Sequence, residues 1–125
     1  MAANDSNGKV VVNLATGMED AERVTVAFLV STAALEKGRQ VAIWLTKDAV
    51  RLALPDEAKG EACDGCPPLE RLFGQFADGG GELLVCPICF NARSLDESQL
   101  VANARIAGAS PLHDWIGEGA TVFSY

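Results

Sequence analysis

The sequence predicts a single α/β domain built around a mostly parallel sheet. Apolar runs without polar alternation recur along its 125 residues, as expected of strands that are covered on both faces. Segments whose apolar residues follow helical spacing separate these runs. A strand, a crossover helix and a second strand in succession form the unit from which parallel sheets are assembled.

The first of these units is the clearest. Lys9–Leu14 is a β-branched run and predicts the first strand. A helix is expected from about Asp20 to Lys37, opened by a capping-box pattern over Thr16–Glu19 and ended by Gly38. Gln40–Thr46 is again apolar and predicts a second strand parallel to the first.

A second unit follows directly. Residues 47–54 predict a short helix, and the polar, acidic residues 56–62 predict a surface loop. Prolines at the start and three glycines at the end define a helix within residues 67–81, because proline at the first helical positions loses no hydrogen bond. Glu82–Cys86 is then the third strand.

The remaining elements are shorter. Residues 94–104 open with a capping-box pattern and predict a short helix, and residues 105–107 predict a short fourth strand. Ser110 is the expected N-cap of a helix over residues 111–116. Residues 121–125 complete a five-stranded sheet. Residues 1–8 are expected to be a frayed lead-in, so the domain covers residues 9–125.

Composition and charge exclude several classes of function. A net charge of −7 and a pI near 4.5 argue against direct binding of nucleic acid, which requires a surface rich in lysine and arginine. No stretch reaches the roughly 18 to 20 apolar residues needed to span a bilayer. The polar start lacks the features of a signal peptide, so a cytoplasmic location is expected, where thiols are usually kept reduced.

The four cysteines form two C-x-x-C pairs. Cys86 ends the third strand and Cys89 follows in the loop, whereas Cys63 and Cys66 precede the helix that leads into that strand. In a parallel sheet, helices run back from the carboxyl edge, so both pairs are expected at that edge. Cys66 also lies directly before a helix N-terminus, which favours the reactive thiolate form.

Spacing alone leaves three interpretations of these thiols open. In the first, Cys86 is a nucleophile that carries sulfur as a persulfide, with Cys89 as a resolving or relay thiol. In the second, Cys63, Cys66, Cys86 and Cys89 bind one zinc ion through four thiolates, giving a binding or structural module without catalytic activity. In the third, some or all of the cysteines pack as small hydrophobic residues.

The order of segments resembles the DsrE/DsrF-like family of small sulfur-relay proteins. The strand Leu84–Cys86, with Arg93 seven residues beyond its cysteine, carries much of this resemblance. The stretch Ala104–Ala109 and the ending Val122–Tyr125 are similar to the end of the family's chain. The pair Cys63 and Cys66 departs from the family pattern.

This resemblance implies a flavodoxin-like three-layer α/β/α sandwich and homo-oligomers, often trimers or hexamers. It also implies that Cys86 accepts persulfide sulfur from a donor protein and hands it to an acceptor protein, as a sulfurtransferase without a cofactor. Cys89 is a second candidate for this role. The single histidine, His113, lies far along the chain from Cys86 and is expected to face solvent or to make a local hydrogen bond. Without G-x-G-x-x-G or Walker motifs, nucleotide binding has little support.

Overall fold

A computed structural model, which describes residues 8–125, contains five parallel strands in the order β4-β3-β2-β1-β5. The expected frayed segment therefore falls almost wholly on residues 1–7, outside the described part. The sequence left the strand order open. The strands are β1 Lys9–Leu14, β2 Gln40–Leu45, β3 Glu82–Val85, β4 Ala104–Ile106 and β5 Thr121–Ser124.

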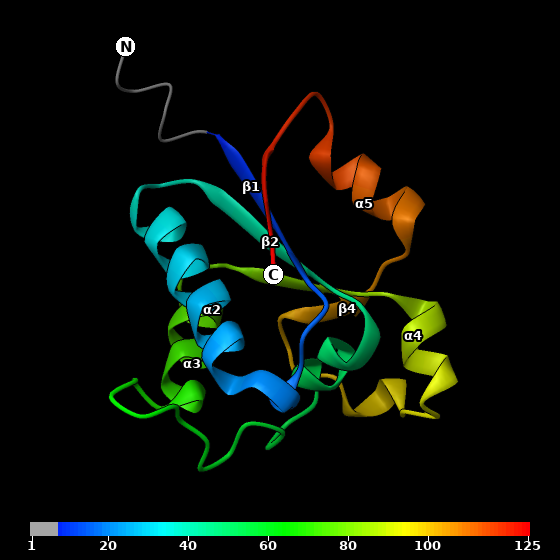
Figure 1. Ribbon diagram of the computed structural model, residues 1–125. Helices are drawn as coiled ribbons and strands as arrows, with labels where there is room; N and C mark the ends of the chain where they lie inside the picture. Colours follow the sequence, from blue (N-terminus) through cyan, green and yellow to red (C-terminus); the bar gives the residue numbers. More distant parts are fainter. Residues whose placement is uncertain (1–7) are drawn as a thin grey trace.

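The direction of the strand order explains the layers. From β1 to β4 the chain steps steadily one way, so right-handed crossovers bring α2 (Ala21–Glu36) and α3 (Leu69–Asp78) to the same face. From β4 the chain returns to β5, which brings α5 (Ala109–Ile116) to the opposite face, as Figure 1 shows. The predicted three-layer α/β/α architecture is confirmed. Flavodoxin itself has the order 2-1-3-4-5, so the likeness lies in the layers rather than in the strand order.

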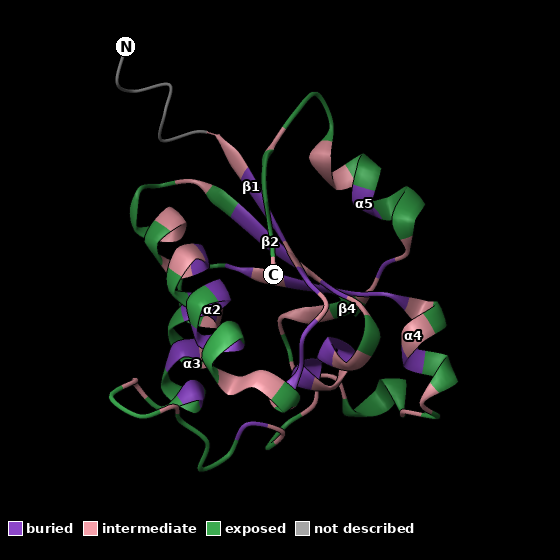
Figure 2. Ribbon diagram, viewed as in Figure 1, coloured by how far each residue is buried: buried purple, intermediate pink, exposed green. Residues whose placement is uncertain are grey.

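The two faces of the sheet are covered unequally. The main core lies between the sheet and the helices α2 and α3, and it includes the fully buried Phe28, Phe76 and Phe90. The core beneath α5 is small, and Leu112 is its buried residue from that helix. The edge strand β5, at the end of the sheet next to β1, is exposed along its whole length (Figure 2).

The ends of α2 differ slightly from the prediction. Its N-cap is Asp20, whose side chain accepts a hydrogen bond of 3.0 Å from the backbone N–H of Arg23. Glu19, expected within a capping box, instead accepts from the backbone N–H of Gly17 at 2.9 Å, because a 3₁₀ turn over Met18–Asp20 precedes the helix. Gly38 follows the helix with a φ of 83°, a left-handed conformation that favours glycine, as predicted.

The segment after β3 differs most. Residues expected to form a loop are the helix α4 (Pro87–Ala92), which proline at its first position favours. No α-helix follows in residues 94–104. Ser94 has a φ of 55°, which no helix permits, and the capping-box pattern forms only the 3₁₀ turn Glu97–Gln99. The next helix, α5, begins at Ala109 with Gly108 as its N-cap rather than Ser110.

The connection from β2 to α3 follows the prediction more closely. The expected short helix is a 3₁₀ helix, η2 (Lys47–Ala53). Residues 56–62 form turns, but they are not purely a surface loop, because Ala58 is buried within the main core. Across residues 8–125, no helix has both the length and the apolar character needed to cross a membrane.

Candidate functional site

Cys86 lies where β3 ends and α4 begins. Its backbone N–H donates to the Leu45 carbonyl at 3.0 Å, which extends the β3–β2 ladder by one residue. Its carbonyl accepts from the Phe90 N–H at 3.0 Å, the first hydrogen bond of α4. Cys86 is therefore the N-cap of α4, and only 9% of the residue is exposed. Sheet and helix together fix this thiol at the carboxyl edge of the sheet, where open α/β sheets bind their ligands.

Cys89 lies in the first turn of α4, one turn beyond Cys86. It is partly buried, and both thiols are free of disulfides. The sequence predicted a loop here, and the helix changes the geometry, because residues three apart in a helical turn lie on the same side. Between the two cysteines, Ile88 points into solvent with 78% of its surface exposed.

A cluster of charged residues ties α4 to the end of β2. The Asp48 carboxylate, in η2, accepts hydrogen bonds from Nε of Arg93 at 3.0 Å and from Nε of Arg51 at 3.1 Å. Arg93 also donates through Nη1 to the Cys89 carbonyl at 3.1 Å. The segments that follow β2 and β3 are thus joined through one arginine, which holds the helix carrying Cys89 in place.

The same cluster perturbs a carboxyl group. Hydrogen bonds from Arg93, and then from Arg51, lower the pKa of Asp48 below its ordinary value because they stabilise the ionised carboxylate. The charge of Arg51 also acts on the carboxyl group of Glu57, so this cluster holds carboxyl groups as well as guanidinium groups.

The other two cysteines are bonded to each other. Cys63 and Cys66 form a disulfide across the turn Cys63–Cys66, in which Gly65 has a φ of 76°. Cys63 Sγ lies 3.7 Å from Oγ1 of Thr25, so the pair lies against α2. In Figure 1 the long connection before α3 and the helix α4 lie on different sides of the carboxyl edge.

The four cysteines do not form a metal site in this arrangement. Within residues 8–125, no group of three or more histidine, cysteine, aspartate or glutamate residues is placed to hold a metal ion. A structural zinc site needs four ligands around one point, and here Cys63 and Cys66 are bonded to each other. The arrangement therefore does not fit the four-thiolate zinc hypothesis.

Sequence reasoning singled out Arg93 only through the family resemblance and missed its partners, Asp48 and Arg51. The sequence does place Asp48 and Arg51 near this site, since an acid and a base three residues apart follow directly after a strand that ends at the same edge as Cys86. It does not show that Asp48 pairs with Arg93. The helix after Cys86 was also open to prediction, from the same first-position proline rule used elsewhere in the chain. His113 is exposed, as expected.

Comparison with known proteins agrees with this architecture. Residues 9–125 match the DsrE/DsrF-like family, which is nearly the whole chain. No curated protein matches the sequence significantly.

Three solved structures share the fold at low sequence identity. The ychN protein of E. coli has a TM-score of 0.77 and 16% identity, over 95% of this chain and 99% of its own. BT1422 of Bacteroides thetaiotaomicron, a conserved protein of unknown function, has a TM-score of 0.65 and 17% identity, over 100% of this chain and 98% of its own. MTH1491 of Methanobacterium thermoautotrophicum, also of unknown function, has a TM-score of 0.63 and 15% identity, over 95% and 100%. With the match over residues 9–125, the chain belongs to the DsrE/DsrF-like family.

Proposed function

We propose that this protein is a cytoplasmic sulfur carrier of the DsrE type, in which Cys86 accepts a sulfur atom and passes it to a partner protein. The observation that carries the proposal is the position of Cys86. It is a free thiol at the end of β3 and the start of α4, in a chain that matches the DsrE/DsrF-like family along nearly its whole length.

The transfer needs no oxidant or cofactor. The donor is a protein persulfide, R–S–SH. The Cys86 thiolate attacks its terminal sulfur, the donor S–S bond breaks, and the donor leaves as a thiolate with the bonding electron pair. Cys86 then carries the persulfide, and an acceptor thiolate takes the terminal sulfur in the same way, which regenerates Cys86. Cys89, one turn away, is the relay thiol that takes the sulfur from Cys86 within the chain.

The surroundings of α4 suit this chemistry. The guanidinium group of Arg93, which donates to the Cys89 carbonyl, favours an anionic persulfide at this helix. Ile88 offers a large exposed apolar side chain between the two thiols, where a donor or acceptor protein can pack. Partner proteins therefore dock on α4, and Ile88 is their contact on this chain.

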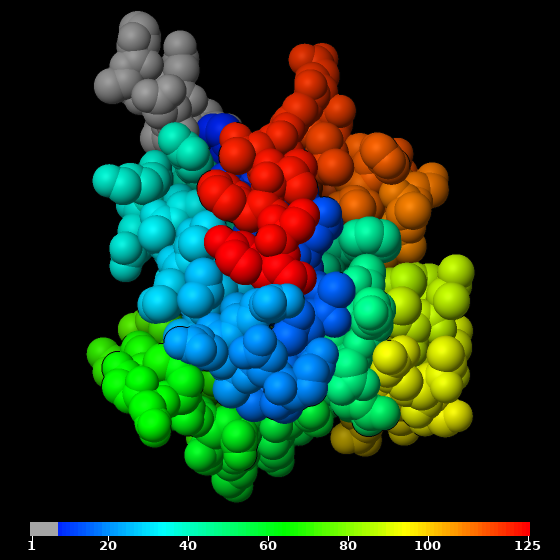
Figure 3. Space-filling view, viewed as in Figure 1, coloured from blue at the N-terminus to red at the C-terminus, as the bar shows by residue number. Residues whose placement is uncertain are grey.

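A further part of the proposal is that the chain assembles with itself, as a trimer or hexamer. Val26 and Leu29 on α2 are exposed, as are Val122 and Phe123 on β5. Phe123 pairs with Val12, whose side chain belongs to the core beneath α2, so Phe123 lies on the α2 side of the sheet. Figure 3 shows β5 on the surface beside α2. Exposed apolar side chains on α2 and on the α2 side of β5 are the usual material of subunit interfaces.

The test of sulfur transfer is mass spectrometry of the intact protein after incubation with a persulfide donor. Wild-type protein is expected to gain the mass of one sulfur atom, and Cys86→Ser is expected to gain none. The double variant Cys63→Ser/Cys66→Ser is the matched control and is expected to gain sulfur like the wild type. No adduct on wild type, or an unchanged adduct on Cys86→Ser, would overturn the proposal.

Partner docking has a separate readout. Ile88→Ser is expected to accept sulfur normally from a small persulfide but slowly from a protein persulfide, because only the protein contact is lost. An equal rate from both donors would show that Ile88 is not the docking contact.

A further inference from the structure

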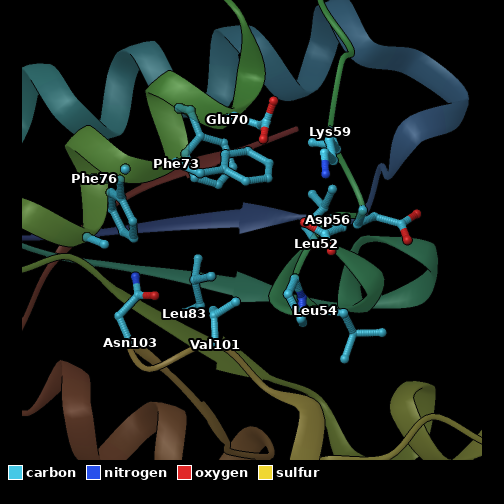
Figure 4. Close-up of a pocket in the computed structure, with 16 residues that line it drawn as sticks. Leu52, Leu54, Asp56, Lys59, Glu70, Phe73, Phe76, Leu83, Val101 and Asn103 are labelled. Carbon is cyan, nitrogen blue, oxygen red and sulfur yellow. The ribbon is translucent and has the colours of Figure 1, made fainter.

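A cavity with a largely apolar lining lies away from Cys86, between α3 and the segments that face it. Its volume is about 240 Å³. Figure 4 shows Phe73 and Phe76 of α3 on one side and Leu83 and Val101 on the other, with Leu52 of η2 at one end. The lining residues come from distant parts of the chain, so the cavity exists only in the folded domain.

The interior of the cavity is apolar and aromatic. The ring of Phe28 lies 4.4 Å from that of Phe73 and 5.5 Å from that of Phe76, in an edge-on arrangement with the latter. Phe28 and Phe76 are fully buried, which fixes this wall. At the far end Asn103 is held by a hydrogen bond of 3.1 Å from its amide to the Gly81 carbonyl. A rigid aromatic wall favours a ligand with a flat apolar body.

The mouth of the cavity is polar and acidic. Asp56, Glu57 and Glu70 stand there with a single lysine, Lys59 (Figure 4 labels all but Glu57). Among the described residues, none of these three carboxylates takes part in an ion pair. Glu70 accepts a hydrogen bond of 3.2 Å from the Gly60 N–H, which fixes its position. Burial raises the pKa of Glu57, opposed by the charge of Arg51, so this carboxyl group is partly withdrawn from water.

Gly74 is a position at which the cavity can be tested. It lies in the middle of α3, where glycine costs roughly 0.5–1 kcal/mol relative to alanine. A Cβ atom at this position would meet no atom within 4 Å, so packing does not require glycine. Because residue 74 lines the cavity, a larger side chain there would narrow it. Alanine fits at this position without a clash, so only a longer side chain would test whether the cavity is needed for binding.

We propose that this cavity binds a small molecule with a one- or two-ring apolar body and a protonated amine at the acidic mouth. The volume fits a body of this size, because an apolar cavity of about 150 Å³ holds benzene and typical ligand sites begin near 300 Å³. Asp56, Glu57 and Glu70 together outnumber Lys59 and the nearby Arg51, so the mouth favours a cation over an anion. The site is separate from sulfur transfer and does not depend on it.

Three related probes separate shape from charge. Tryptamine carries the amine, 3-methylindole is neutral, and indole-3-propionate is an anion on the same ring. Isothermal titration of the full chain is expected to rank their affinities in that order, with about a two- to fivefold gain from the exposed charge pair. Glu57→Gln/Asp56→Asn is expected to remove the advantage of tryptamine while leaving 3-methylindole unchanged.

Two variants at one position test the cavity itself. Gly74→Ala is expected to bind all three probes like the wild type, whereas Gly74→Leu is expected to lose about tenfold or more in affinity. Val101→Phe narrows the cavity from the opposite wall and serves as the second test if Gly74→Leu does not fold. Cys86→Ser is expected to bind normally. Failure of every probe to bind at millimolar concentration, or full binding by both filled variants, would overturn the proposal.

Discussion

The contact between Gly81 and Phe76 gives a sharp test of how β3, and with it Cys86, is positioned. A Cβ atom on Gly81 would overlap the Phe76 ring. That ring is fully buried and packs edge-on against Phe28, so moving it aside would disrupt this contact. Gly81 N–H also donates to the Phe76 carbonyl at 2.9 Å, which holds the two residues together. Gly81→Ala is therefore expected to destabilise the protein through overpacking.

The magnitude follows from the size of the chain. Overpacking by one methyl group costs typically about 1–3 kcal/mol. An unfolding entropy of roughly 2.1 cal/mol/K per residue gives about 0.26 kcal/mol/K for this chain, so 1 kcal/mol corresponds to about 4 °C in Tm. Gly81→Ala is expected to lower Tm by about 4–11 °C. Gly74→Ala, the matched control with open space around its Cβ, is expected to raise Tm by about 2–4 °C.

Thermal unfolding followed by circular dichroism measures both changes. A double-mutant cycle isolates the contact, because Phe76→Leu removes the part of the ring that the new methyl group would overlap. In the Phe76→Leu background, Gly81→Ala is expected to cost less than half of what it costs in wild type. An equal cost in the two backgrounds would refute the overpacking explanation, and so would an unchanged Tm in the single variant.

Two further predictions concern the site and the disulfide. Because hydrogen bonds lower the folded-state pKa of Asp48 below 3.8, its stabilising effect is present above that pH and is lost as the pH falls through the folded-state value. Asp48→Asn is therefore expected to be less stable than wild type at pH 7, by under about 1 kcal/mol because the Asp48–Arg93 pair is partly exposed. In urea titrations this difference in unfolding free energy is expected to shrink below pH 3.8. A difference that does not change with pH would contradict the role given to Asp48. The disulfide joins two cysteines that are three residues apart, and the loop-closure entropy of so short a loop stabilises the protein by about 2 kcal/mol. Cys63→Ser/Cys66→Ser is therefore expected to lower Tm by up to about 7 °C relative to oxidised wild type. Thiol titration of the unreduced, unfolded wild type is expected to find only Cys86 and Cys89 free, and four free thiols would contradict the disulfide.

The sequence by itself determined the elements whose signals are local. Lys9–Leu14 and Gln40–Thr46 were predicted as strands because unbroken β-branched and apolar runs suit a sheet covered on both faces. The structure confirms both strands, the second ending one residue earlier at Leu45. The family, the α/β class and the position of Cys86 at the end of β3 also followed from segment order. The helix α4 was not predicted, although its signal, a proline at the first helical position, is equally local.

The tertiary structure alone decided what depends on segments far apart in the chain. An apolar run shows that a strand is buried but not which strand lies beside it, so the order β4-β3-β2-β1-β5 could not be read from periodicity. For the same reason the pairing of Asp48 with Arg93, 45 residues apart, was invisible in the sequence. Spacing likewise allowed Cys63 and Cys66 to join Cys86, and only the fold showed them bonded to each other against α2. The cavity beside Gly74 is of the same kind, because its walls are brought together by packing alone.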